Sequence, residues 1–393
     1  MDEGEQGSAG KAWFRWPGPP KGLGMEALDG GARVGRDREE MNRALPARPG
    51  ELRIRSLAYG RITSLDQARR WRDRTDSIVP VFAVDGTPVA AGYGTVTVPL
   101  GPGPHIVTVQ TQDSKDDCCT AVAVDGGAGA SLDYVAPYSS WKAAPEIADV
   151  SLHGRFGPAG ILPEGWPGEQ EGGPWRWGVL AAVAAAFVAG LVVARAGPPG
   201  PAALVAAVVV LPALAAGAAA GLLAGRRRKG MAAAADQRAG ALPGAPPVGF
   251  GDAWHGGDGA AADARPRPRD PSHALIVVRQ ELRQWTDPVP EGSVMGDASL
   301  LPQTRLFTPP PRVTVGGRAL PPGWGTWTVE VPPGRHRLGA SLGGAHASQE
   351  VSAVPGGTAE VVLSVRMERR WSGSGAGAAL VAETPVVAFA RRG

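Results

Sequence analysis

VDGTPVAAGYGTVTVPLGPGPHIV at residues 84–107 is similar to a second stretch of the chain, VGGRALPPGWGTWTVEVPPGRHRL at residues 315–338. The two stretches align without a gap at an offset of 231 residues and share the patterns V-x-G, G-aromatic-G-T-x-T-V and P-G-x-H. A further matching pair follows, AVAVDGGAGASLDYV at 121–135 and EVSAVPGGTAEVVLSV at 350–365. So many matches in register indicate that one structural unit occurs twice in the chain.

The repeated unit has the residue pattern of β structure. Polar and apolar residues alternate in Thr95–Val98 and in Thr326–Val329, which is the period of a half-buried strand. Asp-Gly or Gly-Gly precedes this strand and Pro-Gly follows it, and both dipeptides suit tight turns. An earlier strand is expected in each copy, at 52–56 and at 274–278. We therefore predict two small antiparallel β-sandwich domains, residues 51–138 and 274–370.

This pattern resembles the PEGA-type and related prealbumin-like or Ig-like β domains, in which two strands flank a Pro-Gly turn. The matching residues are 84–86 with 101–109 in the first copy, and 315–317 with 331–338 in the second. Both copies lack the namesake motif of that family and its usual Gly-Tyr after the last strand. The resemblance implies a non-catalytic binding or spacer module, and it transfers no site residue to this chain.

Two long apolar stretches lie between the copies. WGVLAAVAAAFVAGLVVA at 177–194 and AALVAAVVVLPALAAGAAAGLLAG at 202–225 contain no charged residue. At a rise of 1.5 Å per residue they would reach about 27 and 36 Å as helices, enough for a hydrocarbon core of about 30 Å. The short link between them leaves room only for two antiparallel helices. We predict a mainly β protein with a two-helix transmembrane hairpin, residues 177–225, flanked by the two sandwich domains; the alternative is a buried hairpin in a soluble core.

The residues flanking the hairpin predict its orientation. A basic run follows the second helix directly, whereas the short link carries a single basic residue, Arg195. By the positive-inside rule, both termini are cytoplasmic and the protein crosses the cell membrane twice. The first fifty residues contain no apolar stretch of the kind found in a cleavable signal, which agrees with this orientation. The predicted topology determinants, which could also contact lipid headgroups, are Arg226, Arg227, Arg228 and Lys229.

Small residues recur at every fourth position of both predicted helices, among them Gly190, Gly217 and Gly221. Such stripes let helix backbones approach closely in lipid, where packing drives association. The stripes could pack the two helices together or against a second copy of the chain. The expected partners are therefore the lipid bilayer, an unknown protein and a possible homo-oligomer.

The remaining segments have the composition of linkers. Gly (57) and Pro (38) make up a large share of the chain, and the Ala-, Gly-, Arg- and Pro-rich usage is typical of a GC-rich bacterial genome. We expect a disordered N-terminal segment and two linkers, with one short helix at 64–71 inside the first domain. A tail follows the second domain, in which 380–389 could add an edge strand although Pro385 weakens that expectation. The segments are 1–50, 139–176, 226–273 and 371–393.

No residue pattern indicates catalysis, a cofactor or a metal. Cys118 and Cys119 follow two aspartates, whose charge opposes thiolate formation. His105 and His336 are expected to hydrogen-bond their turns, and the polar cluster at 252–258 lies in linker-like sequence. Nucleotide-binding and hydrolase motifs are absent, and a net charge of +3 is too small to indicate nucleic acid. We expect a protein that is not an enzyme and holds no cofactor or metal.

Tyr93 and Trp324 occupy equivalent positions between two glycines and are the candidate interaction residues, with core packing as the alternative. Duplicated modules around an anchor suit bivalent binding. We therefore hypothesise a membrane-anchored, non-catalytic protein whose two modules bind a protein partner, or each other, near the membrane face. The alternative hypothesis is an accessory subunit of a transporter or secretion complex in which the hairpin is the interacting element.

Overall fold

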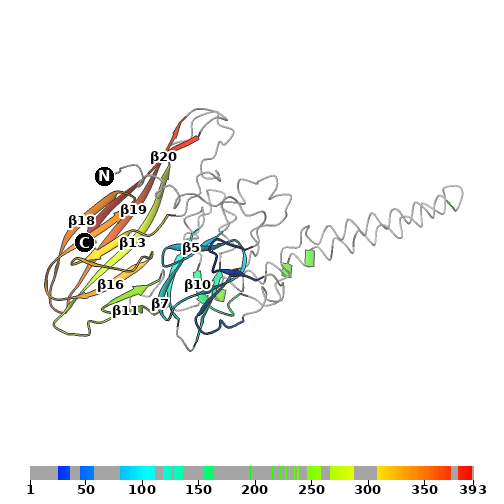
Figure 1. The fold of residues 1–393 in the computed structure, drawn as a ribbon, viewed down its shortest axis with the longest axis horizontal. Helices are drawn as coiled ribbons and strands as arrows, with labels where there is room; N and C mark the ends of the chain where they lie inside the picture. The colour runs from blue at the N-terminus through cyan, green and yellow to red at the C-terminus, as the bar shows by residue number, and fades with distance from the viewer. Residues whose placement is uncertain are drawn as a thin grey trace.

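In a computed structural model of the chain, the described segments are 25–35, 45–56, 80–110, 118–124, 128–135, 155–162, 246–257, 266–286, 308–372 and 379–391. Single residues between 195 and 238 are described as well. The described part is mainly β, and its strands form two packed modules (Figure 1).

The first module consists of two five-stranded sheets, with the strand orders β1-β5-β4-β7-β8 and β10-β9-β3-β6-β2. Their apolar faces enclose a common core that includes Leu52, Ile54, Phe82, Val96 and Tyr134. The strands are β1 (Glu26–Ala27), β2 (Arg33–Val34), β3 (Glu51–Ser56), β4 (Val81–Val84), β5 (Thr87–Ala91), β6 (Gly94–Pro99), β7 (Gly103–Gln110), β8 (Cys118–Val124), β9 (Ala130–Val135) and β10 (Arg155–Pro158).

The second module pairs a six-stranded sheet, β11-β12-β16-β13-β19-β20, with a four-stranded sheet, β15-β14-β17-β18. Its core includes Ile276, Trp327, Val329, Leu338 and Leu363. The strands are β11 (Val248–Phe250), β12 (Ala253–Gly256), β13 (Ala274–Thr286), β14 (Arg312–Val315), β15 (Arg318–Ala319), β16 (Thr326–Val331), β17 (Gly334–Leu342), β18 (Ala345–Ala353), β19 (Thr358–Ser372) and β20 (Ala379–Arg391).

The two modules share one topology, as the sequence repeat predicts. The order β5-β4-β7-β8 corresponds to β15-β14-β17-β18, and β9-β3-β6 corresponds to β19-β13-β16. The first turn of the repeat is also as predicted: Asp85 and Gly86 have φ of 50° and 79°, and Gly316 and Gly317 have φ of 59° and 84°. Positive φ at both central residues is what a two-residue hairpin turn requires.

The prediction of purely antiparallel sandwiches is wrong for one strand pair in each module. β3 pairs with β9, and β13 with β19, in the parallel direction. These are the first and last strands of the repeat, and a parallel pair needs a long crossover connection. The rest of the repeat provides that crossover, which no local pattern reveals.

Several segments predicted to be linkers contribute strands. β1 and β2 come from 1–50, β10 from 139–176, and β11 and β12 from 226–273. Each strand pairs at a sheet edge or extends a neighbouring edge strand, and each is too short to show a hydrophobic period. The same edges are extended in both modules: β2 and β12 pair with β6 and β16, while β10 and β20 pair with β9 and β19. β20 confirms that 380–389 forms an edge strand despite Pro385.

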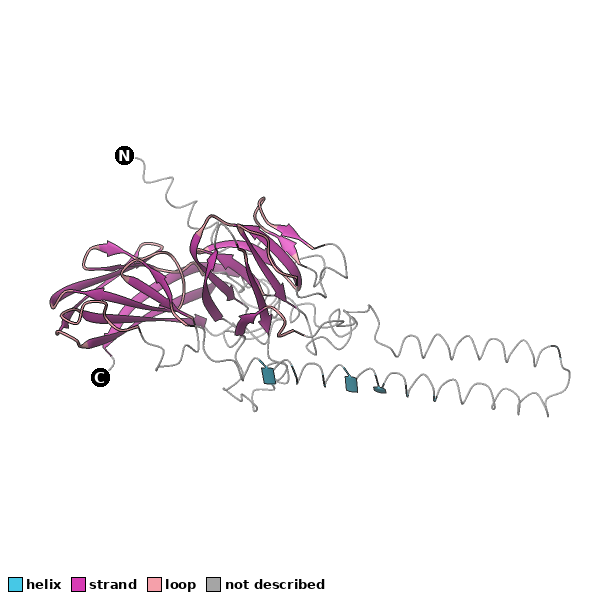
Figure 2. Cartoon of the chain, turned by 90° about the horizontal axis from the view of Figure 1, so that it is seen from below, coloured by secondary structure: helices cyan, strands magenta, loops and turns pink. Residues whose placement is uncertain are grey.

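The predicted hairpin lies mostly outside the described residues. Among the residues that the structure does describe, no helix is both long enough and apolar enough to cross a membrane. Arg195, Ala215 and Ala219 are helical, as are Leu222 and Leu223, which are 66% and 65% exposed. Arg226, Arg227 and Arg238 are helical and exposed as well, and the helical pieces drawn in cyan lie outside the sheets (Figure 2). Gly190, Gly217, Gly221, Arg228, Lys229 and the helix expected at 64–71 lie outside the described residues.

The two modules pack directly against each other. β11 and β12 of the second module lie beside β7 and β8 of the first (Figure 1). Ile106 and Cys119 of the first module belong to the hydrophobic core of the second, where Trp324 is buried. The contact is close at Gly323, because a Cβ atom there would lie 2.4 Å from Ile106 Cδ1.

Replacing Gly323 by Val should therefore separate the modules. The added side chain would overlap Ile106, and such overpacking costs about 1–3 kcal/mol. We expect one calorimetric unfolding transition in the wild-type chain and two in the variant. Gly101→Val is the matched control, because a Cβ at Gly101 meets nothing within 4 Å. A single unchanged transition in Gly323→Val would show that this contact does not join the modules.

Candidate functional site

Trp324 lies at the junction of the two modules and is 7% exposed. Both neighbouring glycines are needed there. A Cβ at Gly323 would overlap Ile106, and one at Gly325 would lie 2.7 Å from both Cys119 Sγ and His255 Nε2. Gly325 also has a φ of 125°, in the region that side chains disfavour. The Gly-Trp-Gly sequence therefore places the indole where residues of both modules meet.

A chain of hydrogen bonds crosses this junction. The side-chain amide of Gln110 donates to the carbonyl of Thr308 (2.8 Å) and accepts from the Thr308 N–H (3.0 Å). The indole N–H of Trp324 donates to the same carbonyl (3.1 Å), and the Trp324 carbonyl lies 2.6 Å from His255 Nε2. Gln110 ends β7 of the first module, whereas the other three residues belong to the second. The junction is thus both apolar and specifically hydrogen-bonded.

The two predicted interaction residues are both buried. Tyr93, 6% exposed, directly precedes β6 and lies between Gly92 and Gly94, which have φ of 109° and 149°. Trp324 joins the modules, and the structure does not bring the two aromatic residues together in one site. Neither side chain is open to an outside partner in this arrangement. Trp324 lies where the two modules meet, in a core shared with Ile106 and Cys119.

His255 is the residue at this junction that sequence reasoning missed. The sequence predicts a polar linker here, yet β12 pairs with β16 and directs His255 into the core. There it is fully buried and packs against Trp327 at a ring-centroid distance of 5.0 Å. Burial lowers its pKa from 6.5 to about 4, although the hydrogen bond to the Trp324 carbonyl acts in the opposite direction. The ring is therefore neutral at pH 7 and donates its Nε2 proton to that carbonyl, and its Nδ1 has no hydrogen-bond partner.

His255 should make the protein less stable in mild acid. The unfolded chain takes up a proton on this residue near pH 6.5 and the folded chain only near pH 4, so the free energy of unfolding falls as the pH falls between these values. The loss should reach about 3 kcal/mol at pH 4. Denaturant unfolding of wild type and His255→Gln across pH 4–7.5 measures it, since glutamine can donate to the same carbonyl without titrating. Parallel pH curves for the two proteins would contradict this account of His255.

A second polar site holds the Pro-Gly turn of the first module. His105 Nδ1 lies 2.7 Å from Asp85 Oδ2, and its Nε2 lies 2.8 Å from the Gly101 carbonyl. The other oxygen of Asp85 accepts from the Ile106 N–H at 2.9 Å. A neutral ring can donate from only one nitrogen, whereas an imidazolium satisfies both acceptors. Burial lowers the pKa of His105, but the bonds to Asp85 and Gly101 and the charge of Asp85 outweigh it and raise the pKa above 6.5.

The second module keeps only half of this site. His336 Nε2 lies 2.7 Å from the Pro332 carbonyl, the equivalent of the Gly101 contact. Gly316 stands where the first module has Asp85, so no carboxylate faces the ring. As predicted, both histidines hydrogen-bond their turns. The ion pair is a feature of the first module alone.

Asp85→Asn should lower the pKa of His105. Asparagine tolerates the positive φ of position 85 but removes the charge that favours the imidazolium. The contribution of this pair to stability is present below pH 6.5 and is lost as the pH rises through the higher pKa of the folded state. NMR titration of the His105 ring gives the pKa directly. Asp29→Asn, at an exposed position elsewhere in the module, is the control, and equal shifts in both variants would contradict the assignment.

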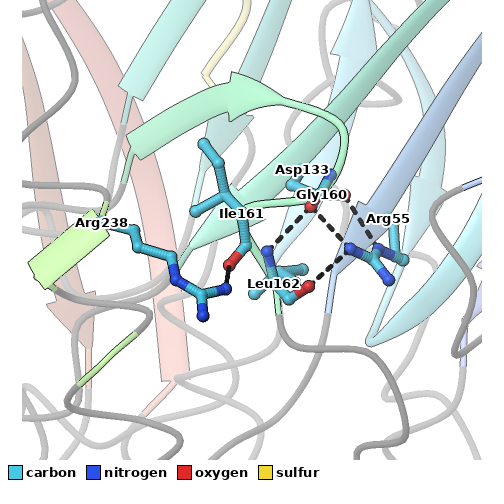
Figure 3. Close-up of polar contacts among 6 residues, drawn as sticks. All are labelled: Arg55, Asp133, Gly160, Ile161, Leu162 and Arg238. Carbon is cyan, nitrogen blue, oxygen red and sulfur yellow. Dashed lines mark hydrogen bonds and ion pairs between the residues drawn. The ribbon is translucent and has the colours of Figure 1, made fainter.

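The third polar site is a buried ion pair on the outer face of β3 and β9. Arg55 and Asp133 are 2% and 1% exposed, and their strands place them directly opposite each other. Arg55 donates from Nε to Asp133 Oδ1 (2.9 Å) and from Nη2 to Oδ2 (2.7 Å), a bidentate pair. Asp133 Oδ2 also accepts the N–H groups of Gly160 and Leu162, both at 2.9 Å (Figure 3).

The sequence pattern does not predict that Arg55 and Asp133 form a buried ion pair. Arg55 and Asp133 alternate with apolar residues along their strands, so each has the pattern of a solvated outward position. The structure buries them because residues 160–162 fold over this face of the sheet. A buried ion pair contributes little net stability, but loss of one partner leaves an uncompensated charge at a cost of about 3–5 kcal/mol.

None of these sites has the geometry of an active centre. Within the described ranges, no group of three or more His, Cys, Asp or Glu side chains could hold a metal ion. Cys119 is buried and its Sγ faces Gly325. Each of the three polar sites instead joins two parts of the chain. The site at Trp324 joins the two modules, the site at His105 joins a strand to its turn, and the Arg55–Asp133 pair joins a sheet to a loop.

Comparisons of the chain with protein-family models, curated proteins and solved structures found no match.

Proposed function

We propose that the chain is a membrane-anchored, non-catalytic binding protein whose two β modules act as one joined unit near the membrane face. The observation that carries the proposal is that one sandwich topology occurs on both sides of residues 177–225 and that the two copies pack together. The buried polar groups of the sandwiches hydrogen-bond to other parts of the protein, so the sandwiches are suited to act as a rigid support for a binding surface on their outside. The proposal does not rest on the resemblance to PEGA-type domains, which the comparisons do not support.

Two described residues favour the membrane anchor. Leu222 and Leu223 are helical and about two-thirds exposed, whereas large apolar side chains elsewhere in the described part are mostly buried. Arg226 and Arg227 follow within one turn and are exposed as well. Exposed leucines directly before basic residues are what the end of a membrane-spanning helix presents to lipid and then to the headgroups.

The packed junction changes how the modules can bind. Two modules that move independently would act as two tethered sites, whereas docked modules present one continuous surface with a fixed geometry. The partner then contacts the outside of the joined unit and not Tyr93 or Trp324, which are enclosed. The alternative, an accessory subunit that binds through the hairpin, depends on Gly190, Gly217 and Gly221, and no observation on the described residues favours it.

The membrane assignment is tested by expressing the full chain and washing the membranes at alkaline pH, with reporter fusions at both termini. We expect the chain to stay in the pellet and both reporters to signal from the cytoplasmic side. Leu214→Arg, in the middle of the second predicted span, should weaken insertion because an arginine there costs about 2.5–3.5 kcal/mol. The conservative Leu214→Val is its control. Release of the wild-type chain by the wash would refute the anchor.

A further inference from the structure

The buried ion pair of the first module, Arg55 with Asp133, also binds the loop at 160–162 outside its own sheet. Besides Arg55, Asp133 accepts hydrogen bonds from the backbone of Gly160 and Leu162, and Arg55 Nη2 donates to the Leu162 carbonyl at 2.9 Å. Ile161 and Leu162 are 6% and 0% exposed, so their side chains are also enclosed. Asp133 Oδ2 and Arg55 Nη2 are thus both hydrogen-bonded to the loop at 160–162 (Figure 3).

The second module shows that the sandwich does not need this ion pair. Arg55 pairs across the sheet with Thr95 and Asp133, and the equivalent residue, Arg279, pairs with Thr326 and Val362. Arg279 is exposed, and an apolar residue stands in place of the aspartate. The same topology therefore forms without the carboxylate. What distinguishes the first module is the loop that the carboxylate holds.

The loop that the ion pair holds, residues 160–162, lies directly before the segment that contains the predicted hairpin. Residue 162 is the last described residue before the segment that contains the predicted hairpin, and Arg238 is a helical residue after it. Arg238 Nη1 donates to the Ile161 carbonyl at 3.4 Å (Figure 3). Residues from the two ends of the inserted segment thus contact each other at the loop that Arg55 and Asp133 hold to the sheet, and the chain continues from Arg238 to β11 of the second module.

We propose that Arg55 and Asp133 form a joint that fixes both ends of the inserted segment, the loop at 160–162 and Arg238, to the first module. Combined with the proposed membrane function, on which this part rests, the joint sets the orientation of the first module relative to the membrane.

The joint itself is tested by amide hydrogen exchange on the full chain. In Arg55→Leu/Asp133→Val, which replaces the pair by apolar residues as at Val362, the amides of Gly160 and Leu162 should exchange roughly tenfold faster or more, because they lose their acceptor. Amides of β3 and β9 should keep their protection. Glu51→Gln, which removes the exposed contact of Glu51 with Arg33 on the same sheet, should change neither set. Unchanged exchange at Gly160 and Leu162 overturns the proposal.

The orientation is tested by a distance measurement between spin labels at Thr87→Cys in the first module and Arg227→Cys beyond the predicted span, with both native cysteines replaced by serine. We expect one narrow distance distribution, and a distribution roughly twofold wider in Arg55→Leu/Asp133→Val. Leu162→Gly leaves the ion pair intact, loosens the loop and should widen the distribution too. Equal widths in all three proteins overturn the joint.

The same samples separate this inference from the proposed function. A chain that does not enter lipid nanodiscs refutes the membrane anchor, yet the distance distribution in solution still tests the joint. A chain that enters nanodiscs and shows the same broad distribution with and without the ion pair keeps the anchor and refutes the joint.

Discussion

The parallel pairing of the first and last repeated strands closes each sandwich, and the rest of the architecture depends on it. β3 with β9, and β13 with β19, bring together residues about 80 positions apart. Of the strands that lie between them in the chain, all except β6 and β16 form the opposite sheet. Once this pair forms, both edges of its sheet are available to further strands. β2 and β10 use those edges in the first module, and β12 and β20 use them in the second.

Duplication has produced one scaffold with two sets of polar contacts. The backbone keeps its turns and strand order, while the charges differ at equivalent positions: Arg55 faces Asp133 where Arg279 faces Val362, and His105 faces Asp85 where His336 lies near Gly316. In each comparison the first module has the ion pair. Of these two pairs, Arg55 with Asp133 holds the loop at 160–162, from which the inserted segment departs, whereas His105 with Asp85 holds a turn of its own module.

The junction between the modules relies on neutral groups. His255, Gln110 and Trp324 provide hydrogen bonds without charge, and burial keeps His255 neutral at pH 7 by lowering its pKa to about 4. A charged pair at the same place would have to lose its hydration, whereas the neutral groups lose less. Glycines at 323 and 325 complete the junction because their positions leave no space for a Cβ atom. The two modules therefore form a single unit with a fixed relation.

The sequence alone determined what depends on neighbours in the chain. Alternation at Thr326–Val329, the turns at Asp85-Gly86 and Gly316-Gly317, and the repeat itself are local patterns, and strands and turns formed where they predicted. Only the tertiary structure decided the parallel closing pair, the short added strands, the burial of His255 and the ion pair of Arg55 with Asp133. Each of these depends on a hydrogen-bond partner or a covering surface that comes from a distant part of the chain. The residues adjacent in sequence do not specify which distant segment will cover a given side chain.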